Sequence, residues 1–245
     1  REGCTSCRRD TRRAVTGPHE CGKTREGRGE DKLAMSARSV GHLLAAVATL
    51  ALCACGEQSL RTHRGMARAV IERGGGGELF TDASTAEFAA VRHAPSGLLC
   101  EIPRSGDFSV EVFPPSAANP GVYCASAAAD VATSYVAVLY GPAVDIDTAF
   151  SQALAASAGQ ASPQVWSGEP SAADKVSPEG LPHFRIARFS ATVNGEPAYL
   201  RVAMAEARGW FLQQIVSGPI AEADAIEARA GEGWRRALTA FAETP

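Results

Sequence analysis

The chain has 245 residues, of which 45% are hydrophobic and 21% are charged, and its formal net charge at neutral pH is −3. This composition is typical of a globular protein, so it excludes a fully disordered chain, a collagen-like fibre and a multi-pass membrane protein. The acidic balance also argues against a protein that binds nucleic acid through a basic surface.

Residues 1–34 have a composition of their own. They hold three of the seven cysteines and many charged residues, but almost no apolar ones. Such a stretch cannot bury enough surface to offset its ordering entropy, so we predict a disordered upstream extension. Cys4 and Cys7 have the spacing of a redox or zinc pair, but a structural zinc site would require a second pair.

A segment typical of secretory signals begins at Met35. Arg38 supplies a positive charge, and residues 43–52 form an apolar run of ten. A helix that spans a bilayer needs roughly 20 apolar residues, so this run is too short to cross one. We predict a signal peptide over residues 35–54. A buried core helix is the alternative, but the run is apolar on every face rather than on one.

The apolar run ends in Leu52-Cys53-Ala54-Cys55-Gly56. This segment resembles the lipobox of bacterial lipoproteins, in which a Leu, a tolerant position and a small residue precede the lipidated Cys. Cys55 matches that pattern, whereas Cys53 would place Leu52 at the small-residue position. The resemblance implies acylation of Cys55, for example by palmitate, anchoring to a membrane, and a periplasm-facing place in the bacterial envelope. Gly56 is not the Asp that retains lipoproteins at the inner membrane, which favours the outer membrane.

Residues 55–78 follow as a predicted lipidated tether, because four consecutive glycines at 74–77 make a flexible joint. A phosphate-binding loop would also need a following Lys-Ser/Thr and a preceding strand, which are absent from this sequence. Residues 55–245 carry 21 acidic and 14 basic side chains, so we expect no nucleic-acid partner. The sequence leaves room for an envelope protein as a partner besides the membrane.

Residues 79–245 are long enough for one hydrophobic core, and we predict a single domain there. Short apolar runs separated by Gly, Pro and Ser predict strands. Ile146, Phe150 and Leu154 recur every four residues, which predicts a helix. Asp145 can cap its start and Gly159 can close it. The four strands expected before this helix lie at 97–102, 108–113, 122–125 and 134–140.

Three more strands are predicted at 184–193, 198–206 and 210–216, followed by a helix at 221–242. Tight turns such as Asn194-Gly195 join these strands, so they must run antiparallel. Gly231 and Gly233 inside the last helix indicate either a kink or close packing on the sheet.

The predicted class is therefore α+β: an antiparallel sheet of six or seven strands with helices packed on it. The element order β-β-β-β-α-β-β-β-α over residues 90–243 resembles the PsbP-like and DcrB-like group of α/β/α domains. Several members of that group are exported lipoproteins. The resemblance implies an architecture and no residue roles.

Cys100 and Cys124 are the only cysteines beyond the predicted anchor. Because an envelope location is oxidising, we predict a disulfide between them. The alternative is a metal site formed with His93, but its spacings are wide and no fourth ligand is evident.

No catalytic residue, metal site or cofactor is predicted, and the expected function is a non-enzymatic binding or assembly role in the envelope. Two alternatives stay open. One is an envelope hydrolase that uses His93 with Ser96, and the other is a cell-wall polysaccharide binder that uses Trp166 in the loop over 160–182. Arg185 and Arg201, if they share a face of the sheet, could also clamp an anion.

Overall fold

The computed structural model describes residues 57–74, 77–113, 119–141, 144–158, 163–175, 183–193 and 195–243. The predicted upstream extension, signal peptide and Cys55 lie outside the described residues. A helix over 57–73 comes first. The other elements are β1 (Phe80–Asp82), β2 (Ala89–His93), β3 (Leu99–Ile102), β4 (Asp107–Phe113), β5 (Gly121–Ala128), β6 (Val131–Leu139), α2 (Ile146–Ala158), β7 (Gln164–Val165), η1 (Ala172–Lys175), β8 (Phe184–Val193), β9 (Glu196–Ala207), β10 (Trp210–Pro219), η2 (Ile220–Glu222) and α3 (Ala223–Ala242).

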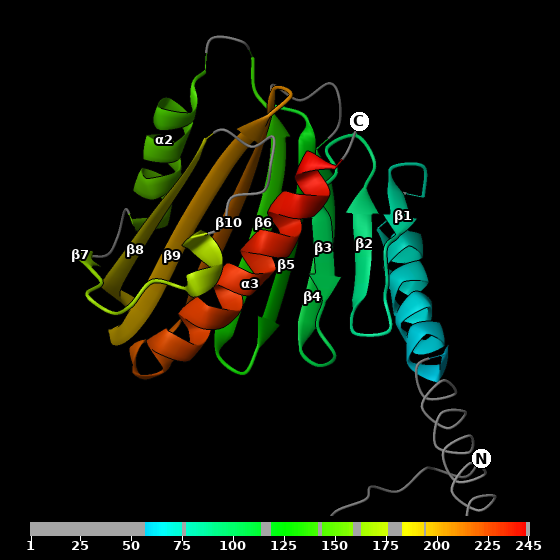
Figure 1. The fold of residues 1–245 in the computed structure, drawn as a ribbon, viewed down its shortest axis with the longest axis horizontal. Coiled ribbons are helices and arrows are strands. Elements are labelled where there is room, and N and C mark those ends of the chain that lie inside the picture. The colour runs from blue at the N-terminus through cyan, green and yellow to red at the C-terminus, as the bar shows by residue number, and fades with distance from the viewer. Residues whose placement is uncertain are drawn as a thin grey trace, which may run out of the picture. The chain divides into compact units, whose positions relative to one another are not determined.

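The strands form two antiparallel sheets, and the predicted α+β class is confirmed (Figure 1). The larger sheet has seven strands in the order β4-β5-β6-β10-β9-β8-β7, and the smaller has three in the order β1-β2-β3. The strand expected at 97–102 therefore belongs to a second sheet that the sequence analysis did not foresee. The other two strands of this sheet, β1 and β2, are only three and five residues long, too short for a clear alternating pattern.

Helices cover both faces of the seven-stranded sheet. Successive side chains of a strand point to opposite faces, so β9 is buried on both sides. Leu200 and Val202 pack with Ala149 of α2, whereas Ala203 belongs to the same buried cluster as Trp234 of α3. In Figure 1, α3 crosses the face of the sheet nearest the viewer.

The helix over 57–73 packs on the smaller sheet. Ala67 and Val70 are buried in the same apolar cluster as Phe80 of β1 and Val91 of β2. These residues were predicted as part of a tether, and the structure differs because small apolar side chains at helical spacing suffice to dock a helix on a short sheet. No helix within the described ranges is long and apolar enough to cross a membrane.

A disulfide joins the two sheets. Cys100 of β3 is bonded to Cys124 of β5, and their Cα atoms are 6.2 Å apart. Both cysteines are buried in the main apolar cluster. The bond holds the smaller sheet against the same face of the larger sheet that α3 covers, because Cys124 and Tyr135, its partner on β6, face α3.

The two glycines inside α3 mark close packing rather than a kink. A Cβ at Gly231 would lie 2.2 Å from Ser171 Oγ, and a Cβ at Gly233 would lie 2.8 Å from Tyr135 Oη. Real Cβ atoms do not tolerate either distance, so only glycine lets the helix approach both neighbours.

Candidate functional site

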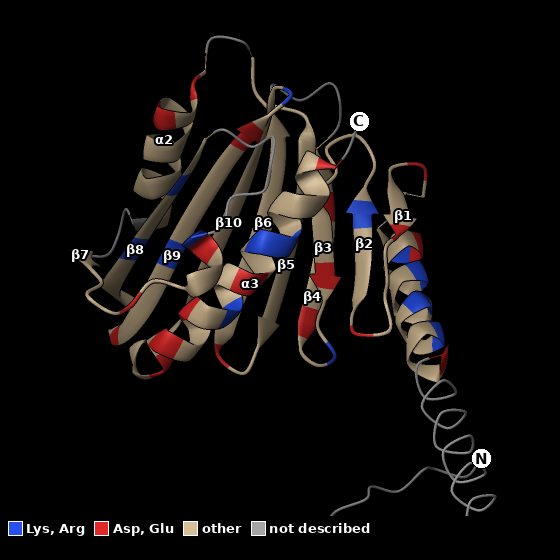
Figure 2. Cartoon of the chain, in the orientation of Figure 1, with Lys and Arg blue, Asp and Glu red and all other residues tan. Residues whose placement is uncertain are grey.

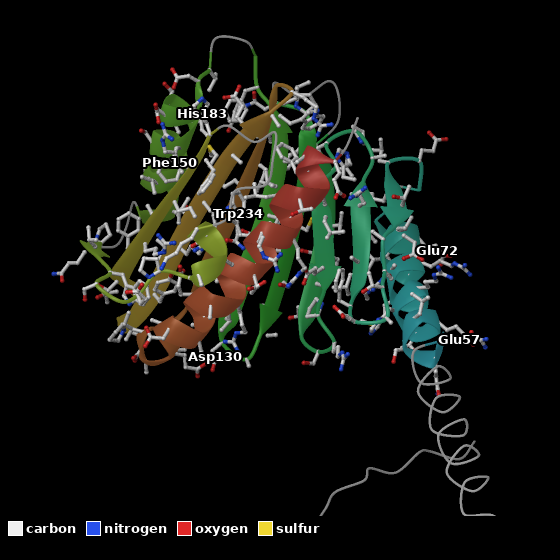
Figure 3. The ribbon with its side chains drawn as sticks, viewed as in Figure 1. Glu57, Glu72, Asp130, Phe150, His183 and Trp234 are labelled. Atoms are coloured by element: carbon white, nitrogen blue, oxygen red, sulfur yellow. A yellow bond between two sulfur atoms is a disulfide. The ribbon has the colours of Figure 1, made fainter. Side chains whose placement is uncertain are left out.

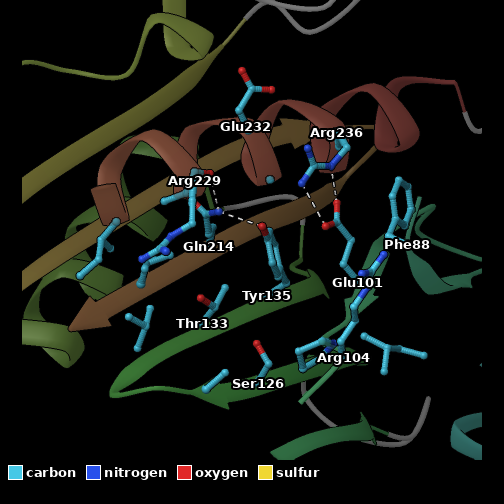
Figure 4. A pocket seen from close by; sticks show the side chains of 18 of the residues that line it. Phe88, Glu101, Arg104, Ser126, Thr133, Tyr135, Gln214, Arg229, Glu232 and Arg236 are labelled. Carbon is cyan, nitrogen blue, oxygen red and sulfur yellow. Dashed lines mark hydrogen bonds and ion pairs between the residues drawn. The ribbon is translucent and has the colours of Figure 1, made fainter. Parts of the chain in front are cut away.

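A groove with a volume of about 820 Å³ runs between α3 and the strands β2 and β3. Strands β5, β6 and β10 form its floor (Figure 4). We call it the α3 groove. Its lining includes Met66, Glu87, Phe88, Glu101, Ile102, Arg104, Ser126, Val131, Thr133, Tyr135, Gln214, Val216, Glu222, Ile226, Ala228, Arg229, Glu232 and Arg236.

Three hydroxyl groups lie on the floor of the groove. Ser126 of β5 pairs with Thr133 of β6, and Tyr135 lies two residues further along β6, so all three face α3. Tyr135 Oη accepts a hydrogen bond of 2.8 Å from Gln214 Nε2. Burial raises the pKa of Tyr135 to about 12, so the phenol stays neutral and keeps a proton to donate.

An ion pair joins the two walls of the groove. Arg236 of α3 makes two hydrogen bonds to the carboxylate of Glu101 of β3, one of them 3.0 Å from Nη2 to Oε2 (Figure 4). The Arg236 guanidinium also lies over the ring of Phe88, 5.8 Å from its centroid. On the outer side of α3, Glu232 pairs with Arg235. These contacts leave both carboxylates neutralised.

A buried network of charges lies beside the groove, on the same face of the sheet. Arg201 of β9 is fully buried, and its two terminal nitrogens donate to both carboxylate oxygens of Asp174 in η1, each at 2.8 Å. Its Nη1 also donates to Glu227 of α3 at 2.9 Å. Arg188 of β8 bonds the same two carboxylates. Gln214 connects this network to the groove, since its Oε1 accepts from Arg201 Nε at 3.0 Å.

The environment of Glu227 keeps the buried network ionised. Burial alone would raise the pKa of Glu227, but hydrogen bonds from the Ser171 N–H and the Tyr199 hydroxyl, and the charge of Arg201, lower it below its usual value. Burial and the same carboxylate raise the pKa of Tyr199. Two guanidiniums and two carboxylates thus compensate each other, as buried charges must.

Arg185 and Arg201 do not share a face of the sheet, so they cannot clamp an anion together. Arg201 faces Arg188, while Arg185 pairs with Met204 and donates from Nε to Asp147 of α2 at 2.8 Å, on the opposite side of the sheet. The sequence did contain a signal that Arg188, rather than Arg185, lies opposite Arg201. The tight turn predicted at Asn194-Gly195 would make residue 193 the partner of 196, which is the pairing that the structure has, and counting back from that pair brings Arg188 opposite Arg201. Asp174 and Glu227 carried no such signal, because each lies far from the arginines in sequence.

His93 and Ser96 do come together, but away from any accessible surface. His93 Nδ1 lies 2.8 Å from Ser96 Oγ, which also accepts a hydrogen bond from the Leu98 N–H. His93 is 3% exposed and Ser96 is fully buried, and neither lines the α3 groove. The pair stabilises the turn between β2 and β3, and a substrate cannot reach it in this conformation.

Trp166 and the two cysteines, which belong to the proposed polysaccharide and metal sites, are both engaged in contacts within the fold. Trp166 is half-buried and packs edge-on against buried Tyr199, with ring centroids 5.0 Å apart, so part of its ring is used in packing. Cys100 and Cys124 are joined in the disulfide, so they offer no thiolates to a metal alongside His93.

We expect His93 to make the protein less stable in mild acid. Burial lowers its pKa from 6.5 to about 4, so the unfolded chain binds a proton more readily than the folded one as pH falls from 6.5 to 4. The free energy of unfolding should fall across that window by up to about 3 kcal/mol. Denaturant titrations at a series of pH values should show this slope in the wild type and a reduced one in His93→Gln.

His183 provides the matched control, because it is exposed. The His183→Gln variant should keep the pH dependence of the wild type. Identical pH profiles for the wild type and His93→Gln would contradict the assignment.

No protein-family model and no curated protein sequence matches this chain. The solved structures that resemble it include the following two. PA94, a protein of unknown function from Pseudomonas aeruginosa, is 13% identical with a TM-score of 0.31, over 65% of this chain and 94% of that chain. LpqN, involved in cell envelope biogenesis of Mycobacterium tuberculosis, is 13% identical with a TM-score of 0.33, over 54% of this chain and 82% of that chain. Neither similarity is close enough to transfer a function, and the resemblance to PsbP-like and DcrB-like domains stays a prediction.

Proposed function

We propose that this protein is a lipid-anchored lipoprotein of the bacterial envelope whose folded domain binds a ligand or partner in the α3 groove without catalysing a reaction. The groove is the observation that carries the proposal, because its volume falls in the range of small-molecule sites. Within the described residues, none of its hydroxyl groups on Ser126, Thr133 or Tyr135 hydrogen-bonds to a histidine or a carboxylate. A hydroxyl nucleophile without a base in reach is weakly reactive.

The anchor rests on the lipobox at Cys55 and on two features that agree with it. Cys55 comes two residues before the helix over 57–73, so acyl chains there would hold the folded domain close to the membrane. The Cys100–Cys124 disulfide suits an oxidising compartment such as the periplasm. Gly56 favours the outer membrane over the inner one.

Replacing Cys55 with serine should remove the anchor. In bacteria expressing the full chain and fed an alkyne-labelled palmitate, we expect the wild type to carry the label and to sediment with the membranes. Cys55→Ser should lose the label and should no longer sediment as a lipid-anchored protein, because the predicted acylation site is removed.

Cys53→Ser is the matched control, since Cys53 lies two residues away and fits the lipobox poorly. It should keep both the label and the membrane location. Label retained by Cys55→Ser, or lost equally from both variants, would overturn the anchoring proposal.

A further inference from the structure

Each wall of the α3 groove carries one unpaired cation and one unpaired carboxylate. Arg229 and Glu222 lie on the α3 side, and Arg104 and Glu87 lie on the β2–β3 side, all four exposed. Within the described ranges none of them forms an ion pair, and their only side-chain hydrogen bond is a long one, 3.4 Å from Arg104 Nη2 to the Glu87 backbone oxygen. Figure 2 shows the two signs interspersed along α3. The rim therefore offers both charges to a ligand.

The space between these walls is mainly apolar. Val216 and Ile226 are buried at its base, and Val131, Phe88 and Met66 are half-buried around it. Covering such surface is favourable by about 25 cal/mol per Å². A ligand that matches the groove thus has an apolar body and a head that carries both a positive and a negative charge.

The groove reaches the end of the domain from which the predicted anchor leaves. Its lining includes Ala128 and Ala129, at the turn between β5 and β6. Figure 3 places Asp130, in that turn, and Glu57, the first described residue, at the same end of the domain. If Cys55 is acylated, as proposed above, this end faces the membrane surface.

We infer that the α3 groove binds a single-chain zwitterionic amphiphile, of the lysophosphatidylethanolamine class, presented at the membrane surface. The apolar chain lies against Val216, Ile226 and Val131, with Phe88 and Met66 beside it. Arg229 and Arg104 bind the phosphate, and Glu222 and Glu87 accept hydrogen bonds from the ammonium group. The orientation of the groove toward the membrane rests on the anchor proposed above. The chemistry by which the ligand binds depends only on the residues of the groove.

The test uses the full chain carrying Cys55→Ser, so that no attached lipid competes. Calorimetric titration with 14-carbon lysophosphatidylethanolamine, kept below its micelle concentration, should show saturable binding. The chainless headgroup, glycerophosphoethanolamine, should bind at least a hundredfold more weakly, because burying only four CH₂ groups at about 0.8 kcal/mol each already contributes about 3 kcal/mol. The anionic glycerol and the quaternary choline analogues of the same chain length should also bind more weakly, since neither offers ammonium N–H groups to the carboxylates.

Two exposed alanines on α3 give a matched pair of variants. Ala228 lines the groove and Ala225 does not, so a tryptophan at either position should leave the fold intact. Ala228→Trp should lower the affinity at least tenfold and Ala225→Trp should not change it. Arg229→Gln, which removes a cation without a partner in the described structure, should lower the affinity about fivefold.

Absence of saturable binding, or equal affinity in Ala228→Trp and Ala225→Trp, would overturn the inference. So would headgroup, anionic or choline analogues that bind as tightly as the ethanolamine lipid. Because the protein in this test carries no anchor, failure here leaves the result of the palmitate labelling unaffected, and the two proposals can fall separately.

Discussion

Replacing Arg201 with methionine is expected to lower the free energy of unfolding by about 3–5 kcal/mol. Arg201 is fully buried and bonds to Asp174 and Glu227, which are themselves buried. Methionine restores the volume but leaves the two carboxylates with Arg188 as their only cationic partner among the described residues. Denaturant unfolding of the wild type and the variant at neutral pH measures the loss.

Arg185→Met is the control for removing an arginine from the same sheet. The Arg185 side chain is 41% exposed and pairs with Asp147, which is 71% exposed. Exposed pairs of this kind contribute roughly 0–1 kcal/mol. Similar losses for Arg201→Met and Arg185→Met would contradict the claim that burial makes the network costly to break.

The network also predicts strong coupling between its members. The double variant Arg201→Met with Glu227→Leu removes one charge of each sign and leaves Arg188 paired with Asp174. It should therefore be less destabilised than the sum of its two single variants, by about 1–3 kcal/mol. Additive losses would mean that the two side chains do not act as a unit.

The disulfide is the second feature with a large expected effect on stability. Cys100 and Cys124 are 24 residues apart in sequence, and closing a loop of that size in the unfolded chain stabilises the fold by about 3.5 kcal/mol. The bond also holds β3, which carries Glu101 of the groove wall, against β5 of its floor. The double variant Cys100→Ala with Cys124→Ala should lose about that free energy of unfolding.

Reductant separates the disulfide from the packing of its sulfur atoms. A reducing agent in the denaturant titration should destabilise the wild type by about the same 3.5 kcal/mol and leave the double variant unchanged. Because both cysteines are at most 2% exposed, the folded wild type should resist reduction until it unfolds. A wild type that is insensitive to reductant in the unfolding transition would contradict the prediction.

Much of the large sheet could be predicted from local patterns. The strand predicted at 184–193 has the bounds of β8, and the strand at 210–216 and the helix at 221–242 agree with β10 and α3 to within three residues, because apolar periodicity reports burial directly. The small sheet was missed in part, since β1 and β2 are short. The packed helix over 57–73 was not predicted, because its apolar face is thin and four glycines follow it.

The candidate site was not predicted, for a different reason. The α3 groove collects residues from β2, β3, β5, β6, β10 and α3, and no single stretch of sequence contains enough of its lining to be recognised. The His93–Ser96 pair shows that residues recognisable from the sequence need not form a site. The two residues are close in sequence and meet as expected, but their burial removes them from chemistry.

Whereas the register that opposes Arg188 and Arg201 was read from the structure, the sequence by itself determined the alternating and helical periods and the antiparallel order of the strands after residue 184. These are local properties, governed by side-chain spacing and turn geometry within a few residues. Only the tertiary structure decided that Asp174 and Glu227 neutralise those arginines, and that α3 and β3 stand apart as the walls of a groove. Such contacts join positions up to 135 residues apart, as in the pair of Arg236 with Glu101, and they arise from the packing of whole layers rather than from any local pattern.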